Sequence, residues 1–92
     1  MGEQRIRRRI VVTGRVQGVG FRAHTRQLAL RLGAHGWVRN RPDGSVEAIV
    51  EGEPRAVEAM LAVLHQGPSW AHVDRLDQSS ESPEGLHGFE IR

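Results

Sequence analysis

The fold is decided by the stretch Gly36–Glu51, which reads GWVRNRPDGSVEAIVE. At its middle stands the pair Asp43-Gly44, which is typical of a tight turn between two antiparallel strands. After the turn, apolar residues alternate with glutamates across Ser45–Glu51, the pattern of a strand with one buried face. Before the turn, Gly36–Arg41 reads as a short strand. The stretch therefore predicts a β-hairpin.

A helix is predicted on each side of this hairpin. Upstream, apolar positions recur from Phe21 to Leu32 at the spacing of one helical stripe, and Gly33 stands where that helix would end. Downstream, Pro54 suits the first position of a helix, and a second apolar stripe runs on to Leu64. Each helix thus has one apolar face with which to cover a sheet.

Strands are predicted outside both helices. Ile6–Thr13 is rich in β-branched residues, and its consecutive Ile-Val-Val run indicates a strand buried on both faces. Another strand is expected near His72–Gln78, followed by a polar loop at Ser79–Gly85 and a short closing strand around Phe89 and Ile91. The order is β-α-β-β-α-β with a small extra strand. Two right-handed crossovers joined by a hairpin predict an α+β, ferredoxin-like sandwich, in which an antiparallel sheet carries two helices on one face.

The composition excludes several classes of protein. With 92 residues there is room for one core, so we expect a single domain over residues 1–92. The chain has no cysteine, which removes disulfides, thiolate nucleophiles and cysteine metal sites. No run of about 18 apolar residues could cross a membrane. The polar, arginine-rich start Met1–Arg9 lacks the apolar core of a secretory signal. We expect a cytoplasmic protein, with a monomer as the default.

The isoelectric point near 10.9 suggests nucleic-acid binding, but the net charge is only +2. Because the chain has no Lys, Tyr or Cys, little titrates between His and Arg, so a small positive excess raises the isoelectric point far. The cluster made by Arg5, Arg7, Arg8 and Arg9 is interpreted as the solvated part of a first strand plus an irregular terminus. RNA recognition on this architecture needs exposed aromatic residues on adjacent central strands. Neither Ile6–Thr13 nor Ser45–Glu51 contains one, so we expect no nucleic acid and no membrane as partner.

Glycines punctuate the connection between the first strand and the first helix. The stretch Gly14–Arg22 reads GRVQGVGFR, and its glycines allow positive φ angles and a tight curl. Successive N–H groups can then point into one concavity that holds an anion, beside the positive end of a helix. Arg22 stands where the loop meets the helix, and a guanidinium there can hold two phosphate oxygens at once.

Other interpretations of this loop compete. The glycines could serve the turn sterically, without any ligand. A P-loop is excluded, because no Gly-Lys-Ser/Thr follows. Gly18–Ala23 matches the dinucleotide pattern G-x-G-x-x-A, with Asp43 about twenty residues further on. That match is rejected, because the second strand turns into a hairpin and the chain is too short for a doubly wound sheet.

Asn40 ends the second predicted strand. In a β-α-β unit the two strands are parallel, so the end of the second strand and the loop after the first lie at the same edge of the sheet. The hairpin strand is expected between them and separates them by about 9–10 Å, a gap that can hold a phosphate and a water. An Asn amide can donate and accept hydrogen bonds together, which suits the positioning of a water. Taken alone, Asn40 could equally be a turn residue before Pro42.

Both stretches resemble the acylphosphatase family. Gly14–Arg22 is similar to its first signature, and Gly36–Glu47, GWVRNRPDGSVE, is similar to its second, G-W-V-x-N-x-x-D-G-x-V-E. The resemblance continues to the closing Gly88–Ile91 and so covers nearly the whole chain. It implies that Arg22 is the phosphate-binding catalytic arginine and that Asn40 orients the attacking water. It also implies a phosphate cradle made by the backbone N–H groups of Val16, Gln17, Gly18, Val19, Gly20 and Phe21.

The resemblance implies hydrolysis of a small acyl phosphate to a carboxylate and inorganic phosphate. A carboxylic acid has a pKa near 4.3 by analogy with Glu, so the carboxylate leaves at neutral pH without receiving a proton. Phosphoryl transfer otherwise needs positioning and charge stabilisation. We expect neither a cofactor nor a metal. The five histidines show neither H-x-x-x-H nor H-E-x-x-H spacing.

Non-catalytic alternatives stay open. Similar signatures mark an acylphosphatase-like module of a larger carbamoyl-transfer machine used in hydrogenase maturation, although a free-standing chain that begins with Met1 argues against that role. The others are an RNA-binding module and a regulatory or structural ferredoxin-like domain with a vestigial site. The sequence does not distinguish one acyl group from another, because the recognised atoms belong to the shared phosphate.

Overall fold

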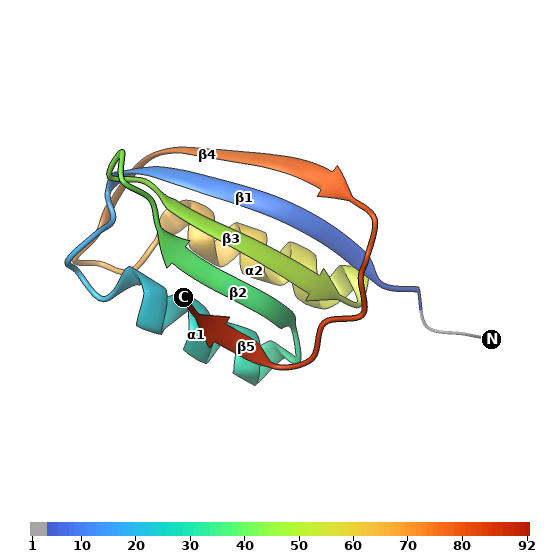
Figure 1. Ribbon diagram of the computed structural model, residues 1–92. Coiled ribbons are helices and arrows are strands. Elements are labelled where there is room, and N and C mark those ends of the chain that lie inside the picture. The colour runs from blue at the N-terminus through green and yellow to red at the C-terminus, as the bar shows by residue number, and fades with distance from the viewer. Residues whose placement is uncertain (1–3) are drawn as a thin grey trace.

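The helices and strands follow the order that the hydrophobic pattern predicts. The computed structural model describes residues 4–92, which form five strands and two helices (Figure 1). In chain order these are β1 (Ile6–Arg15), α1 (Phe21–Leu32), β2 (His35–Asn40), β3 (Val46–Gly52), α2 (Pro54–Gln66), β4 (His72–Glu81) and β5 (Phe89–Ile91). Strand β4 continues to Glu81, through the first part of the predicted polar loop, because it pairs with β1 along nearly its whole length.

The five strands form one sheet in the order β4-β1-β3-β2-β5. Strand β1 is antiparallel to β3 and β4, and β2 is antiparallel to β3, so the predicted antiparallel arrangement is confirmed for these four strands. Strand β5 pairs in parallel with β2. After β4 the chain passes to the opposite edge of the sheet and turns back there, which makes the complete sheet mixed (Figure 1).

Both helices cover the same face of the sheet, as predicted (Figure 1). Between sheet and helices, Ile10 and Val12 of β1 pack with Met60 and Leu64 of α2 in one buried cluster. Val11 lies on the opposite face of the strand, because successive side chains alternate, and it is only partly buried. The prediction that this strand is buried on both faces therefore holds only in part: the helix side is buried at Ile10 and Val12, and the other side is mostly half-buried.

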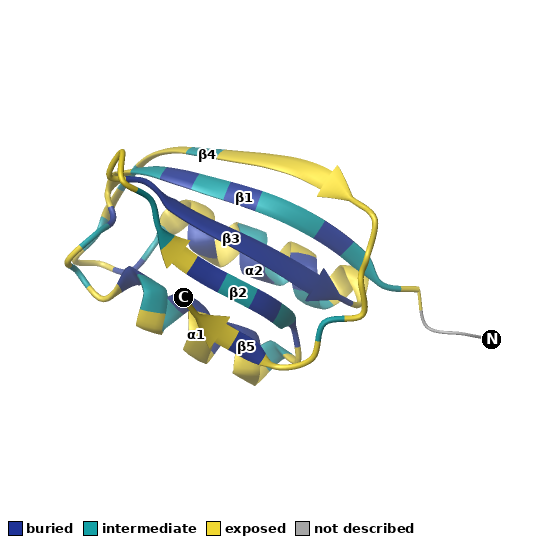
Figure 2. Cartoon of the chain, viewed as in Figure 1, coloured by how far each residue is buried: buried dark blue, intermediate teal, exposed yellow. Residues whose placement is uncertain are grey.

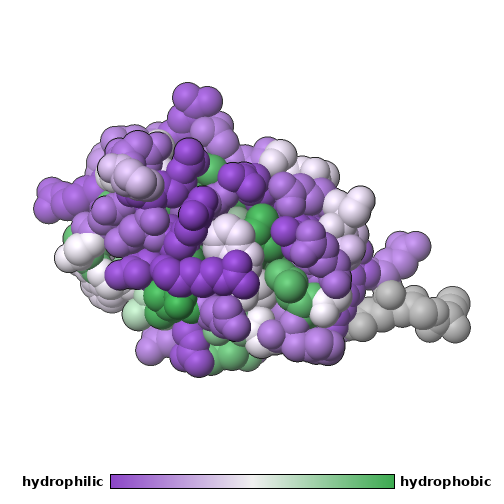
Figure 3. Space-filling view, viewed as in Figure 1, coloured by the Kyte–Doolittle hydropathy of each residue, from purple (hydrophilic) through white to green (hydrophobic). Residues whose placement is uncertain are grey.

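The open face of the sheet is covered by arginines that pair with glutamates. Strand β3 is buried at every residue, and the side chains of Glu47 and Glu51 are fully buried (Figure 2). Arg7 donates a hydrogen bond to Glu51 at 2.7 Å, while Glu47 pairs with both Arg9 and Arg39. The predicted solvated arginine cluster is therefore wrong for Arg7, which is 8% exposed, because a buried carboxylate needs a paired charge. Hydrophilic side chains spread over this face (Figure 3).

Glu51 also anchors the connection between β4 and β5. Its carboxylate accepts hydrogen bonds from the backbone N–H groups of Glu84, Gly85 and Leu86 at 2.8, 3.0 and 3.1 Å. Burial alone raises the pKa of Glu51, but the hydrogen bonds from Glu84, from the Arg7 guanidinium and from the other two amides outweigh it. The pKa of Glu51 therefore lies below its ordinary value, and the carboxylate is charged in the folded protein at neutral pH.

One end of the sheet gathers the segments that the sequence singles out. The carboxyl ends of β1 and β2 and the first turn of α1 lie together, at the left of Figure 1. Neither of the helices within residues 4–92 has the length and the apolar character needed to cross a membrane.

Candidate active site

Three glycines with positive φ shape the connection from β1 to α1: Gly14 near the end of β1, and Gly18 and Gly20 in the loop. Gly14, with φ of 129°, lies at an irregularity of the β1–β4 pairing, and a Cβ there would stand 2.1 Å from the carbonyl oxygen of His72. Gly18 and Gly20 have φ of 73° and 79°, in the left-handed region that disfavours side chains. The backbone path of the loop thus depends on these glycines.

The backbone amides of this loop lack well-formed hydrogen bonds to the rest of the described chain. Within residues 4–92, no N–H group from Val16 to Ala23 donates a hydrogen bond of ordinary geometry; the next, that of His24, donates to the carbonyl of Gly20 at 3.0 Å. Gly20 is the N-cap of α1 and has no side chain to cap the helix, and the first turn contains no acidic residue. The loop and helix start therefore present unpaired donors and the positive end of the helix dipole to a ligand.

Arg22 and Asn40 line the same cavity. It encloses about 170 Å³, well below the roughly 300–1,000 Å³ of sites that hold drug-sized ligands. The Arg22 guanidinium makes no ion pair or hydrogen bond with any residue from 4 to 92. The Oδ1 atom of Asn40 is buried and has no hydrogen-bond partner in the same part of the chain. A cation and an unpaired amide oxygen thus border one hollow, whose size suits a small anion with a water molecule.

The side chain of Gln17 ties the loop to the turn between β2 and β3. Its Nε2 group donates to the carbonyl oxygens of Arg41 and Ser45 at 2.7 and 2.8 Å. The turn is closed by Asp43, whose Oδ1 accepts hydrogen bonds from the hydroxyl and the N–H of Ser45 at 2.6 and 2.9 Å. These two bonds lower the pKa of Asp43 below its ordinary value. Because Asn40 directly precedes Arg41, Gln17 holds the loop in register with Asn40.

The structure brings most of the predicted site residues to this cavity. Its lining residues are Val16, Gly18, Gly20, Phe21, Arg22, Ala23, Asn40 and Ile91. Two residues of the predicted cradle are absent from that lining: Gln17 acts through its side chain, and Val19 packs against the core. The clamp by Gln17 was not predictable from local pattern, because its acceptors lie 24 and 28 positions along the chain. Ile91 lies at the cavity because β5 pairs in parallel with β2.

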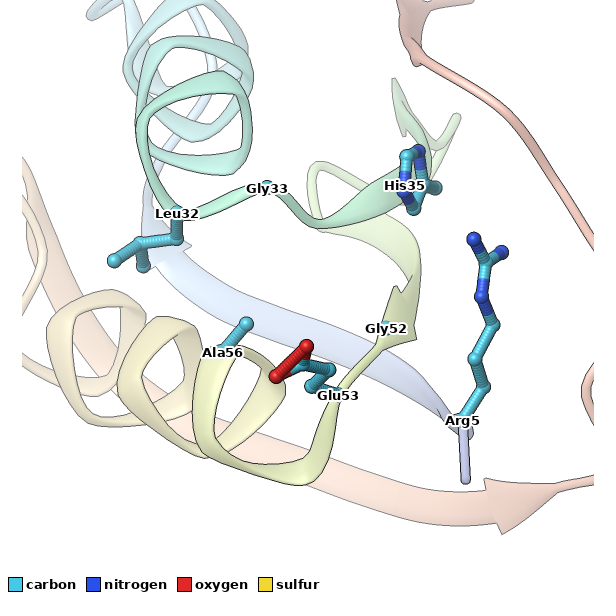
Figure 4. A pocket seen from close by; sticks show the side chains of 7 residues that line it. All are labelled: Arg5, Leu32, Gly33, His35, Gly52, Glu53 and Ala56. Atoms are coloured by element: carbon cyan, nitrogen blue, oxygen red, sulfur yellow. The ribbon is translucent and has the colours of Figure 1, made fainter. Parts of the chain in front are cut away.

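Two further hollows lie outside this cavity. A groove of about 580 Å³ on the open face shares Asn40 with it and contains Trp37, whose ring centroid lies 5.7 and 4.9 Å from the guanidinium carbons of Arg39 and Arg92. A pocket of about 180 Å³ lies at the other end of the sheet, where α1 ends and α2 begins (Figure 4). It contains none of the predicted site residues. No three His, Asp or Glu side chains within residues 4–92 gather in a metal-binding arrangement.

Fold and site together define a small α+β domain whose loop, helix start and unpaired Arg22 suit an anion. The chain belongs to the acylphosphatase family, whose model matches residues 8–91. It is similar to an acylphosphatase of Thermococcus kodakarensis, with 52% identity over 88 residues that cover 96% of this chain and 97% of that protein. An acylphosphatase of Synechococcus sp. is 57% identical over 88 residues, which cover 96% and 94%. The family implied by the two sequence signatures is confirmed.

Solved structures give the same result. The structure of acylphosphatase from Bacillus subtilis matches with a TM-score of 0.91 and 38% identity, over 95% of this chain and 98% of that one. The whole chain also matches 12% of full-length HypF, in its phosphate- and nucleotide-bound form, with a TM-score of 0.89 and 26% identity. The fold therefore occurs both in proteins of similar length and inside a much longer one.

Proposed function

We propose that this protein hydrolyses the carboxyl–phosphate bond of small acyl phosphates to a carboxylate and inorganic phosphate. The observation that carries the proposal is the shared cavity, where unpaired loop amides, the Arg22 guanidinium and the unpaired Asn40 oxygen meet. Membership of the acylphosphatase family agrees with this chemistry.

In this proposal the phosphate dianion sits against the amides from Val16 to Phe21, and Arg22 binds two of its oxygens. Hydrogen bonds between ionised partners are among the stronger ones in proteins, and the start of α1 adds its dipole. As the bond to the acyl group lengthens, negative charge is spread over the equatorial oxygens. Donors that already point at those oxygens stabilise the transition state without reorganisation.

Asn40 orients the attacking water. Its buried Oδ1 is available to accept a hydrogen bond from the water, while its NH₂ group can donate one. The water oxygen forms a new bond to phosphorus in line with the bond to the acyl oxygen, which breaks and leaves its electron pair on the carboxylate. The proton of the water passes to a phosphate oxygen of the substrate, so no protein base is required.

This mechanism uses neither a metal nor a cofactor. The leaving carboxylate is the conjugate base of an acid with a pKa near 4.3, by analogy with Glu, so it departs without a proton donor at neutral pH. Arg22 and the loop amides supply the positive potential that a divalent cation would otherwise provide.

Phosphate release from benzoyl phosphate, measured with and without EDTA, tests the proposal. p-Nitrophenyl phosphate is the control, because an ester oxygen is a poorer leaving group. We expect turnover of benzoyl phosphate that EDTA does not change, and little turnover of the ester. A folded protein that releases no phosphate supports the accessory, regulatory or RNA-binding alternatives instead, and inhibition by EDTA contradicts metal independence.

Two substitutions separate the proposed roles. Arg22→Ala removes a charge that stabilises the transition state and costs about 3 kcal/mol or more of that stabilisation, so kcat/KM falls. Arg22→Lys restores little of the activity, because an ammonium group cannot bind two phosphate oxygens with the planar geometry of a guanidinium. Asn40→Ala lowers kcat and leaves inhibition by inorganic phosphate nearly unchanged. A folded Arg22→Ala variant with wild-type turnover refutes the first role, and an Asn40→Ala variant with normal kcat but weak phosphate inhibition reverses the second.

We also propose that the protein is a cytoplasmic monomer. A chain without cysteine has no need of an oxidising compartment, and its open sheet face carries paired charges instead of an apolar patch. Cell fractionation tests the location, and light scattering at micromolar concentration tests the oligomeric state.

A further inference from the structure

We propose that Trp70 binds the acyl group of the substrate and gives this protein a preference for aromatic acyl phosphates. This inference rests on the proposed function, because it concerns the other half of the same substrate. The phosphate seat recognises what all acyl phosphates share, so any selectivity has to come from a residue beside that seat.

Trp70 lies in the connection between α2 and β4, and its side chain is unusually open for a residue of its size. The residue is 58% exposed. A Cβ built on Gly20 would stand 3.6 Å from the indole Nε1, so the edge of the ring lies next to the backbone of the loop. Gly20 also lines the cavity, and it has no side chain to separate the indole from that hollow. Trp70 itself does not line the hollow, but its indole stands directly beside Gly20, which does.

The sheet order places Trp70 on the side of the loop from which the acyl group has to leave. Water and leaving group stand on opposite sides of phosphorus in an in-line displacement. Asn40, which holds the water, ends β2, whereas the loop follows β1 and Trp70 precedes β4. Strands β2 and β4 lie on opposite sides of β1 in the sheet (Figure 1). With the water on the Asn40 side, the acyl group extends toward Trp70.

The other tryptophan is less suited to this role. Trp37 lies in the groove that shares Asn40, which is the side of the water. Its ring is already in contact with the guanidinium groups of Arg39 and Arg92. The leaving group would have to pass the attacking water to reach it.

The indole offers two kinds of contact to an acyl group. Its ring can stack on an aromatic acyl group in an offset or edge-to-face arrangement. Its Nε1–H makes no hydrogen bond within residues 4–92, so it is available to the carboxyl oxygen that departs. A methyl group, as in acetyl phosphate, covers little of the ring and gains little from it.

Calorimetric binding of two phosphonates tests the inference independently of turnover. Benzoylphosphonate and acetylphosphonate imitate the two substrates with a carbon–phosphorus bond that water does not cleave. We expect the wild type to bind benzoylphosphonate about three- to tenfold more tightly than acetylphosphonate. Trp70→Leu should remove this difference, and Trp70→Phe should retain most of it. Trp37→Leu is the matched control and should leave the difference in place.

The possible results are distinguishable. An undiminished preference in Trp70→Leu, the absence of any preference in the wild type, or a preference that disappears only in Trp37→Leu overturns the inference. Loss of the preference in Trp70→Leu alone supports it. Failure of the proposed function gives a different result: benzoyl phosphate is then not hydrolysed by the wild type, whatever the phosphonates show.

Discussion

Replacing Gln17 tests whether the rate depends on how the loop is held relative to Asn40. Gln17→Leu keeps the approximate size of the side chain and removes the amide that donates to the carbonyls of Arg41 and Ser45 at 2.7 and 2.8 Å. Neither carbonyl loses its last partner: that of Ser45 still accepts from the N–H of Arg41 at 2.8 Å, and that of Arg41 from the N–H of Gly44 at 3.1 Å. The loss is therefore two net hydrogen bonds without an orphaned acceptor, or about 1–2 kcal/mol of unfolding free energy.

The catalytic effect of Gln17→Leu should be larger than the structural one. Without the clamp the loop and Asn40 are no longer held in register, and a misplacement of about 1 Å can lower a rate on the order of a hundredfold. We expect kcat to fall at least about tenfold, while inhibition by inorganic phosphate changes less, because the proposed phosphate contacts come from the loop itself and Arg22. Urea unfolding and benzoyl phosphate kinetics measure the two effects. Gln27→Leu, at an exposed glutamine of α1, is the matched control.

Two results would refute this reasoning about Gln17. If unfolding free energy falls and kcat stays at the wild-type value, the clamp is structural only and Asn40 keeps its position without it. If neither quantity changes, the two hydrogen bonds contribute nothing in solution. A loss of phosphate inhibition that equals the loss of kcat would instead mean that the clamp shapes the cradle itself.

Three further predictions address the loop, the sheet and the electrostatics. Gly14→Ala should lower the free energy of unfolding by about 2–4 kcal/mol, because the new Cβ meets the His72 carbonyl. Gly18→Ala has no atom within 4 Å of its Cβ and should cost only about 1–2 kcal/mol, which is the strain of a left-handed backbone. Equal losses for the two variants in urea unfolding would contradict this prediction. Because the pKa of Glu51 is lowered in the folded state, its contribution is complete above the ordinary pKa of 4.5 and is lost as pH falls below that value. Glu51→Gln should therefore lower the free energy of unfolding by about 3–5 kcal/mol at neutral pH. It should also make that free energy depend less on pH below neutrality. Parallel plots of unfolding free energy against pH for the two proteins would contradict this prediction. Ala23→Glu should keep or raise stability by up to about 1 kcal/mol at the start of α1 while lowering kcat/KM at least about tenfold through repulsion of the phosphate. Ala23→Gln, the uncharged control, should do neither.

The order of elements and the meeting of Arg22 with Asn40 were predictable because both follow from short-range pattern and topology. The Asp43-Gly44 turn fixes the hairpin, and a β-α-β crossover brings the ends of its two strands to one edge of the sheet. The turn acts over a few residues and the crossover over one β-α-β unit. Both can therefore be predicted from the sequence without knowledge of side-chain contacts. The shared cavity is their consequence.

The burial of Glu47 and Glu51 was not predictable in this way. The alternation of side chains along β3 correctly assigns both glutamates to the face away from the helices, but it implies that this face is exposed to solvent. Arginines of the neighbouring strands cover it instead, and which of them meets which glutamate depends on register: Arg9 pairs with Ile49 across the strands, next to Glu47. Register between strands some forty residues apart is set by the whole sheet, and no local pattern encodes it.

The arginines that hold the sheet together are separate from the arginine that is proposed to bind a ligand. On the open face, Arg7 pairs with Glu51 and Glu81, and Arg9 and Arg39 both pair with Glu47, so three arginines meet three carboxylates within the fold. Arg22 has no carboxylate partner among the described residues and stands beside amides that are also unpaired. The net charge of +2 does not describe this difference, because carboxylates offset the arginine charges on the open face of the sheet while the charge of Arg22 has no such partner among the described residues. An anion that enters this cavity gains both the free charge and the free donors, which is why binding is expected there and not on the more arginine-rich face.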